Sequence, residues 1–260
     1  MRYFRFHFSR STLLLICVGA LAGFMSGFFG VGGGLIIVPG LMYAGLSHKE
    51  AAATSLASII PISIIGIATY SFNGNTHWDA ALLMSAGVIG GTSIGSWLLV
   101  RLSEKFLRWF YFIFIGFIAS IQFIFTPRRL DDFTLSFASA AGLIILGIGI
   151  GIIAVLLGVG GGGVMVPSLM FIFHTSDLAA RGSSLIAMLP GGITGSISNA
   201  RKKMIHHSMA VIVGISACVV IPVGAWCAHI LSAEINTYLF GIYLFILLIR
   251  ALISALRSDG

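Results

Sequence analysis

The sequence predicts an all-α protein, a polytopic transmembrane helix bundle made of two homologous repeats that each contain a glycine-interrupted, discontinuous helix. Of its 260 residues, 58% are hydrophobic and only 9% are charged. Apolar runs of about 20 residues, the length needed to cross a bilayer, recur from end to end. Such a chain has more apolar surface than a soluble core could bury, so we expect an integral membrane protein.

Two glycine runs occupy corresponding places in the two halves. Positions 30–42 and 158–170 match at nine of thirteen residues when they are aligned at an offset of 128. After a one-residue insertion the offset becomes 129, which pairs Pro61 with Pro190 and His77 with His206. We therefore predict a first transmembrane repeat over 1–126, a polar linker over 127–136 and a second transmembrane repeat over 137–260.

Each half is expected to contain five apolar segments in the same order. In the first half these are 11–29, a short segment at 35–46 after the glycines, 51–72, 79–100 and 106–125. In the second half they are 137–157, a short segment at 164–173, 179–199, 209–229 and 235–256. Glycines at four-residue spacing, such as those at 19, 23 and 27 and at 87, 91 and 95, predict close helix packing.

The short segments leave two topologies open. Twelve residues span only about 18 Å of the roughly 30 Å hydrocarbon core, so these segments are expected to be half-helices. If each one still changes the side of the chain, a half has five crossings, the halves are inverted and 12 of the 15 Lys and Arg lie inside. If each belongs to one broken span, a half has four crossings, the repeats are parallel and 10 of 15 lie inside. We favour the inverted arrangement, which is the usual build of secondary transporters.

The glycine runs are the first candidate binding elements. Irregular backbone inside a membrane is tolerated where it is buried in protein or lines a cavity. A helix that starts there presents unpaired N–H groups and a positive dipole end, and both favour an anion. The candidate residues are Gly30, Gly32, Gly33, Gly34, Gly158, Gly160, Gly161 and Gly162. The alternative is that the runs serve only as hinges or in close packing.

Hydroxyl side chains follow each run at a second helix start, at Thr54, Ser55, Ser183 and Ser184. Hydroxyls can donate to anion oxygens without the cost of burying a fixed charge, although they can equally bond to carbonyls of their own helix. Arg181 interrupts the same apolar stretch. A charge near the bilayer centre is costly, so Arg181 is expected either to contact an anionic substrate or to reach the headgroups as an anchor.

The remaining ionisable groups limit the possible classes of function. His77 and His206 could carry a coupling proton, or they could be ordinary loop histidines at the interface. The predicted spans contain neither carboxylates nor histidines, so we expect no catalytic residues, no metal site, no cofactor and no enzymatic activity. The net charge of +7 is concentrated beside span ends. This pattern indicates membrane topology and not binding to nucleic acid.

The two GxGGG-x4-P motifs, each followed by an Ala-rich helix start with Ser or Thr (51–56 and 179–185), resemble those of the sulfite exporter TauE/SafE family. The resemblance runs from about residue 12 to 256. It implies a multi-pass permease of the prokaryotic cytoplasmic membrane for small anions, often sulfur-containing, such as sulfite or sulfoacetate. No family-wide role can be assigned to Arg181 on this basis.

The sequence as a whole thus predicts a secondary transporter, an exporter of small anions through a midplane site between the repeats. Its expected partners are the anionic substrate, the lipid bilayer and a coupling ion, either proton or sodium. No motif specifies the number of subunits. The alternative is a membrane protein that does not transport, such as an assembly subunit or an intramembrane enzyme.

Overall fold

The computed structural model describes residues 10–124 and 133–257, and this part of the chain consists of ten α-helices without strands. The first five are α1 (Arg10–Phe29), α2 (Gly34–Tyr43), α3 (His48–Phe72), α4 (Trp78–Arg101) and α5 (Glu104–Ile124). The others are α6 (Phe137–Leu157), α7 (Gly162–Phe171), α8 (Asp177–Arg201), α9 (His207–Ile230) and α10 (Ala233–Arg257). The polar core of the predicted linker, 127–132, lies outside the described residues, and the division into two repeat units stays a prediction.

Length and composition make this a polytopic membrane protein. Among the described helices, α1, α3, α4, α6 and α9 each contain a stretch long and apolar enough to cross a bilayer. The helices that follow the glycine runs, α2 and α7, have ten residues each, as expected for half-helices. The central helix α8 is less apolar because Arg181, Ser183, Ser184 and Asn199 lie on it, all buried against other helices.

Capping residues explain why α3 and α8 begin earlier than their apolar stretches do. Ser47 and Glu50 form a capping box in which each side chain accepts a hydrogen bond from the backbone of the other residue. Ser176 caps α8 with one half of this arrangement, since its side chain accepts a bond from the Ala179 N–H. Such caps accept hydrogen bonds from N–H groups of the first helical turn, which have no acceptor within the helix. Each helix can therefore begin with a polar turn before its apolar stretch.

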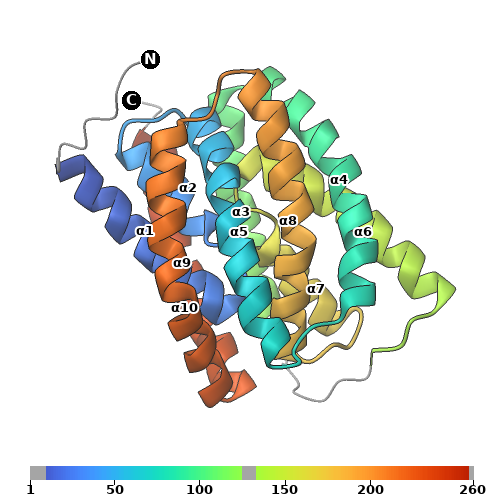
Figure 1. Cartoon of the computed structure of the whole chain (residues 1–260). Coiled ribbons are helices and arrows are strands. Elements are labelled where there is room, and N and C mark those ends of the chain that lie inside the picture. Colours follow the sequence, from blue (N-terminus) through green and yellow to red (C-terminus); the bar gives the residue numbers. More distant parts are fainter. Residues whose placement is uncertain (1–9, 125–132, 258–260) are drawn as a thin grey trace.

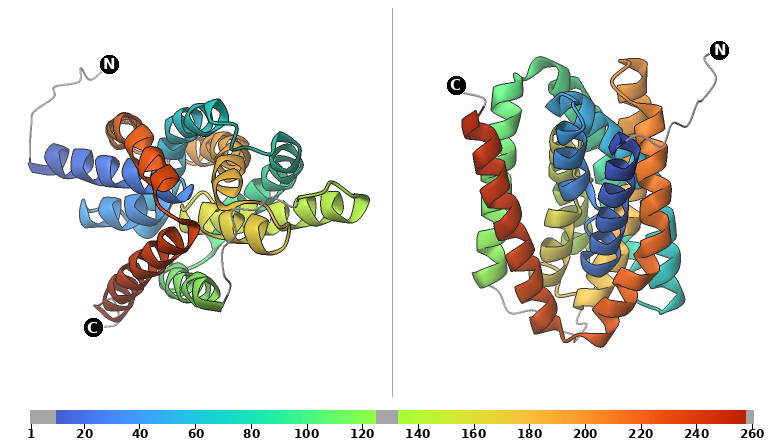
Figure 2. Two further views of the ribbon diagram at one scale, coloured as in Figure 1. Left: turned by 90° about the horizontal axis from the view of Figure 1, so that it is seen from below. Right: turned by 90° about the vertical axis from the view of Figure 1, so that its left-hand side faces the viewer.

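The two halves run in opposite directions through the bundle (Figures 1 and 2). The helices α1 and α2 form a hairpin that enters and returns at one end, and α6 and α7 form a hairpin from the other end. Hydrogen bonds place the α2–α3, α4–α5 and α8–α9 junctions at the end where α1 begins. The N–H of His48, at the start of α3, donates to Glu104 Oε2 at the start of α5 (3.0 Å). The N–H of His206, just before α9, donates to Thr54 Oγ1 in the second turn of α3 (3.1 Å). This placement favours the inverted arrangement, because the parallel one separates the α4–α5 loop from the α8–α9 loop; the membrane topology of the repeats stays a prediction.

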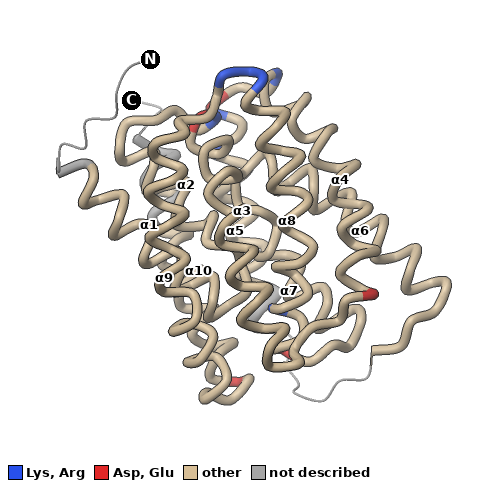
Figure 3. The backbone as a smooth tube through the Cα atoms, in the orientation of Figure 1, with Lys and Arg blue, Asp and Glu red and all other residues tan. Residues whose placement is uncertain are grey.

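The same end carries most of the positive charge (Figure 3). We call it the basic end and define it by the loops 44–47, 102–103 and 202–206. The described cations there are Lys49, Arg101, Lys105, Arg108, Arg201, Lys202 and Lys203. The opposite end, defined by the loops 73–77, 172–176 and 231–232, has Asp79, Asp177 and Glu234 beside it. A bias of this kind is typical of the cytoplasmic side of a membrane protein.

Glycines bring the outer helices into backbone contact. The helix α1 packs on α9, and α6 packs on α4 in the corresponding way. A Cβ atom added to Gly23 would lie 2.2 Å from the Ala217 carbonyl oxygen, and one added to Gly91 would lie 2.1 Å from that of Ile148. The four-residue glycine spacing therefore packs helices, as predicted. Between these pairs, α3 and α8 pack together at the centre.

Replacing Gly91 should destabilise the bundle. The added methyl of Gly91→Ala must push α4 from α6, and overpacking of this kind costs about 1–3 kcal/mol. Gly90 is the matched control, because a Cβ there would meet nothing within 4 Å. Thermal unfolding in detergent should show a lower midpoint for Gly91→Ala and a wild-type midpoint for Gly90→Ala. Equal midpoints for the two variants would contradict this packing.

Single cysteines can test the direction of the chain. In a cysteine-free background, Cys at Ser103 and at Lys203 should be shielded together from an impermeant thiol reagent applied to intact cells. Cys at Asn73, on the opposite end, should be labelled. Labelling of the cysteine at Ser103, with no labelling of the cysteine at Lys203, would support the parallel arrangement instead.

Candidate functional site

The two glycine runs meet in the middle of the bundle. A Cβ added to Gly34 would lie 2.5 Å from the Gly158 carbonyl oxygen, and one added to Gly162 would lie 2.7 Å from the Val31 Cα. The backbones of the two loops thus touch at positions where a side chain would not fit. We call 30–34 and 158–162 the glycine loops. The structure brings all eight candidate glycines together.

The loops need glycine for conformation as well as for space. Gly30, Gly32 and Gly33 have φ of 71°, 73° and 72°, and Gly158, Gly160 and Gly161 have φ of 67°, 76° and 85°. These values are in the left-handed region, which other residues rarely adopt. Both loops therefore share one backbone conformation, and each ends at the first turn of a half-helix.

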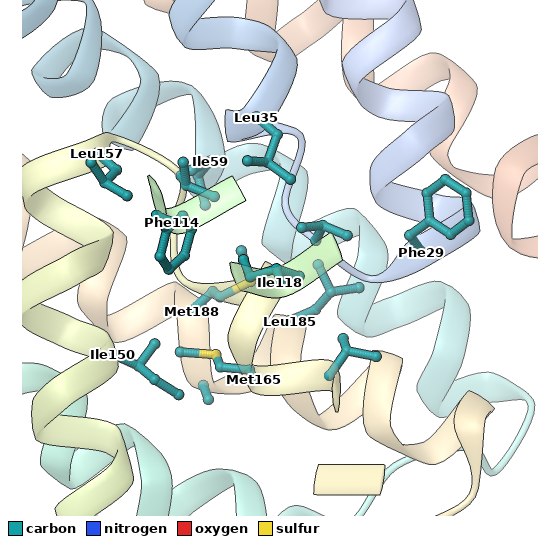
Figure 4. Close-up of a cluster of buried hydrophobic side chains, with 14 of the residues drawn as sticks. Phe29, Leu35, Ile59, Phe114, Ile118, Ile150, Leu157, Met165, Leu185 and Met188 are labelled. Carbon is teal, nitrogen blue, oxygen red and sulfur yellow. The ribbon is translucent and has the colours of Figure 1, made fainter. Parts of the chain in front are cut away.

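Two apolar side chains lie between the glycine loops, and sequence reasoning missed them. The Met188 Cε would be 2.0 Å from a Cβ on Gly32 and 2.7 Å from one on Gly160. Ile59 lies against the same two glycines, and both side chains are buried. Figure 4 shows them within a larger apolar cluster that includes Leu35, Ile118 and Leu185. The offset of 129 that pairs Pro61 with Pro190 also pairs Ile59 with Met188, and this signal could have identified them.

The predicted hydroxyls bind the backbone of the other half. Ser184 Oγ donates to the Gly30 carbonyl and Ser55 Oγ to the Gly158 carbonyl, both at 2.7 Å. Thr54 Oγ1 accepts from the N–H of His206 (3.1 Å) and Ser183 Oγ from that of His77 (2.8 Å). The sequence left open anion binding and bonding within one helix. Ser184 Oγ also lies 2.7 Å from the Arg181 carbonyl of its own helix, so the second expectation holds for this residue. In addition, each of these four hydroxyls holds a loop or a cap of the opposite half.

Arg181 lies inside the protein and does not reach the headgroups. Its side chain is 4% exposed, and Nη1 donates to the Phe28 carbonyl at the C-terminal end of α1. Nη2 pairs with Asp177 Oδ2 at 3.4 Å. A cation at a helix C-terminus is favoured by the helix dipole and satisfies a carbonyl that has no partner in its own helix. Anchoring at the headgroups, one of the two expected roles, is therefore excluded.

Further polar contacts close the same region. The Tyr70 hydroxyl donates to the Gly27 carbonyl at 2.6 Å, next to the carbonyl that Arg181 caps. His229 contacts Asn75 Nδ2 through Nε2 at 2.8 Å, and its ring centroid is 5.7 Å from that of Tyr70. Asp177, His48 and His229 thus lie within helices, which corrects the expectation that the spans contain neither carboxylates nor histidines. The predicted segments 51–72 and 179–199 begin after His48 and Asp177, whereas His229 falls within the predicted segment 209–229 itself, as Asp79 does within 79–100.

The paired histidines lie far from the loops. His77 and His206 are the N-cap residues of α4 and α9, at opposite ends of the bundle. The Nε2 of His206 is 3.4 Å from Glu50 Oε1, and the His77 ring packs on Phe133 with centroids 5.0 Å apart. Both histidines lie at helix ends, which agrees with the interpretation that they are ordinary loop histidines at the interface.

The loops offer hydrogen-bond donors. The N–H groups of Gly33, Gly34 and Leu35 have no acceptor within the described part of the chain, and the same holds for Gly161, Gly162 and Gly163. Both α2 and α7 therefore begin with unpaired N–H groups beside the point where the loops touch. Chemically, such groups can bind an anion and have no acid–base function.

Comparisons with known proteins agree with this architecture. A family model described as "Sulfite exporter TauE/SafE" matches residues 3–122 and 143–259. A "Probable membrane transporter protein" of Haemophilus influenzae is 30% identical over 197 residues, which cover 72% of this chain and 74% of the relative. The "Probable membrane transporter protein YunE" of Bacillus subtilis is 26% identical over 251 residues, covering 87% and 89%. No solved structure matches significantly. The chain belongs to the sulfite exporter TauE/SafE family of membrane transporters.

Proposed function

We propose that this membrane transporter is a secondary exporter of small anions, with sulfur-containing oxyanions or organosulfonates such as sulfite or sulfoacetate as the substrate class. The observation that carries this proposal is the meeting of two glycine loops, each at the start of a half-helix, in the middle of the bundle. The family match supports the choice of substrate class.

In this proposal the anion is held by backbone groups. The unpaired N–H groups of α2 and α7 and the positive ends of their dipoles stabilise the negative charge. Arg181 contributes from a distance, because it offsets the negative C-terminal end of α1, which lies next to the first loop. Ser55 and Ser184 fix the loops by binding their first carbonyls.

Transport requires the apolar pair between the loops to move. Met188 and Ile59 fill the space against Gly32 and Gly160, so an anion can enter only when these side chains withdraw. A methionine side chain suits such a role because it is unbranched and flexible. The coupling ion, proton or sodium, would bind in the conformation in which the loops are accessible.

The basic end is assigned to the cytoplasm, and the protein to the cytoplasmic membrane, because positive residues favour that side. Counterflow of labelled sulfite or sulfoacetate in proteoliposomes tests the function. The protein should accumulate label against a preloaded unlabelled anion, and empty liposomes should not. Failure with both anions, for protein that remains folded, would overturn the proposed substrate class.

Substitutions at the contact between the loops should weaken transport. Gly34→Ala and Gly162→Ala introduce no strain in φ, but each pushes one loop from the other. Losing even one donor of roughly 1.4 kcal/mol lowers anion affinity about tenfold, which labelled counterflow would detect. Gly163→Ala is the local control, since its Cβ would meet a movable side-chain methyl of Ile118 at 3.3 Å. Gly91→Ala controls for instability away from the loops. Wild-type transport by both loop variants would disprove the site.

Arg181 and Asp177 can separate stability from transport. Arg181→Gln removes the guanidinium that pairs with Asp177 Oδ2 inside the protein and should destabilise it by up to about 3–5 kcal/mol, the range for broken buried pairs. The double variant with Asp177→Asn removes both charges and should recover most of the thermal stability. If Arg181 supports anion binding, counterflow by the double variant stays low. Wild-type counterflow would limit Arg181 to a structural role.

A further inference from the structure

The two broken helices, α1 and α6, end against different side chains. Phe28 and Leu156 are counterparts at the offset of 128, and each lies two residues before its glycine loop. The Phe28 carbonyl accepts a bond from the guanidinium of Arg181, which is paired with Asp177. The side chain that faces the Leu156 carbonyl is the imidazole of His48. One helix end is thus met by a permanent cation, and the other by a group that can gain or lose a proton.

This difference lies at matched positions of the two repeats. The offset of 129 pairs Arg181 with Ala52, so the second loop has no charge at this position. A Cβ added to Gly158 would lie 2.4 Å from the Ala52 Cα, so this part of α3 touches the second loop. The same offset pairs Asp177 with His48, each one turn earlier on the same face of its helix. His48 therefore has the place beside the second loop that Asp177 has beside the first.

The imidazole of His48 is buried close to both glycine loops. The residue is 1% exposed, and its Nε2 has no hydrogen-bond partner in the part of the chain that the structure describes. Its ring packs edge-on against Tyr111, with centroids 6.1 Å apart. The Tyr111 hydroxyl donates to the Leu35 carbonyl in the first turn of α2 (2.9 Å). His48 thus lies between the end of α6, before the second loop, and a side chain that binds the start of α2, after the first.

The charged groups that face His48 come from α5. Glu104 Oε2 accepts a bond from the His48 backbone N–H at 3.0 Å, and its carboxylate favours a positive charge nearby. Arg108, one turn further along α5, opposes such a charge. The helices α6 and α7 have no ionisable side chains, and that of α2, Tyr43, is exposed. Other ionisable groups of the basic end have partners elsewhere: Lys49 Nζ at the Val100 carbonyl, Lys202 Nζ at the Ser96 carbonyl and His206 at Glu50.

We propose that His48 binds a proton together with the anion at the glycine loops, and that this proton is the coupling ion. A protonated imidazole has two N–H donors, and its charge strengthens a bond to the Leu156 carbonyl. It would offset the negative end of the α6 dipole beside the second loop, as Arg181 offsets that of α1 beside the first. The proton comes from solution at the basic end, where His48 begins α3.

The anion and the proton stabilise each other at these positions. In this conformation burial and Arg108 favour a neutral ring, because a buried charge without a counter-charge is costly. An anion at the loops supplies that counter-charge, so His48 gains a proton when the anion binds. By linkage, the proton raises the affinity for the anion by the same factor. The pair of Arg181 and Asp177 carries both charges permanently and cannot respond in this way.

The inference rests on the proposed function, and equilibrium dialysis of the purified full chain with labelled sulfite and sulfoacetate tests it. The Kd is measured for the wild type and for His48→Gln between about pH 8 and about pH 5, the range in which histidine titrates. The ratio of the two Kd values cancels the titration of the anion itself. The wild type should become the tighter binder as the pH is lowered, by up to about tenfold per pH unit.

Two further variants complete the test. His206→Gln is the matched control, because it removes an exposed histidine from the same end of the bundle and should keep the pH dependence of the wild type. His48→Asn, with a smaller side chain, replaces His48→Gln if thermal unfolding in detergent shows that the glutamine is not tolerated. Both substitutions remove the proton and keep a hydrogen-bonding amide.

The possible failures can be told apart. If the wild type binds neither anion, the proposed function fails and the proton site fails with it. If the anion binds and the ratio of the Kd values does not change with pH, the glycine-loop site survives and the proton site at His48 is disproved. An equal loss of pH dependence in His206→Gln would overturn the inference, because an exposed histidine would then have the same effect.

Discussion

The structure depends on the hydrogen bonds of two helices that end inside the membrane. Each of α1 and α6 stops at a glycine loop, so its last carbonyls have no partner in their own helix and no water to bind. The opposite half supplies the partners. Ser184 and Arg181 bind the Gly30 and Phe28 carbonyls, Ser55 binds the Gly158 carbonyl, and His48 lies at the Leu156 carbonyl. Neither half could bury its broken helix alone.

The two halves are alike in backbone and differ in side chains. Glycine loops, half-helices, hydroxyls and capping histidines recur at matched positions, while Arg181, Tyr70 and His229 have the counterparts Ala52, Asn199 and Val100 at the offset of 129. The large and charged members of these pairs all lie toward the opposite end. A symmetric frame with asymmetric ends suits a transporter that opens to one side at a time.

Much of the fold could be predicted because apolar length, glycine spacing and internal repetition are local signals. The segment 137–157 has the bounds of α6, and the short segments after the glycines are half-helices. Sequence reasoning also selected the glycines that the structure brings together. It missed Met188, Ile59 and Tyr70 because apolar and aromatic residues are common in any membrane helix, and only three-dimensional contacts distinguish these positions. The bonds of Ser55 and Ser184 were equally out of reach, since their partners are more than 100 residues away.

The central claim is that the touching glycine loops hold an anion through their backbone. Anomalous diffraction from crystals grown with selenite, a heavier analogue of sulfite, tests this claim most directly. The account predicts a selenium peak between the loops, within hydrogen-bonding distance of the N–H groups at the starts of α2 and α7, with the Met188 side chain displaced. Peaks confined to the loops of the basic end, with Met188 still lying between Gly32 and Gly160, would contradict it.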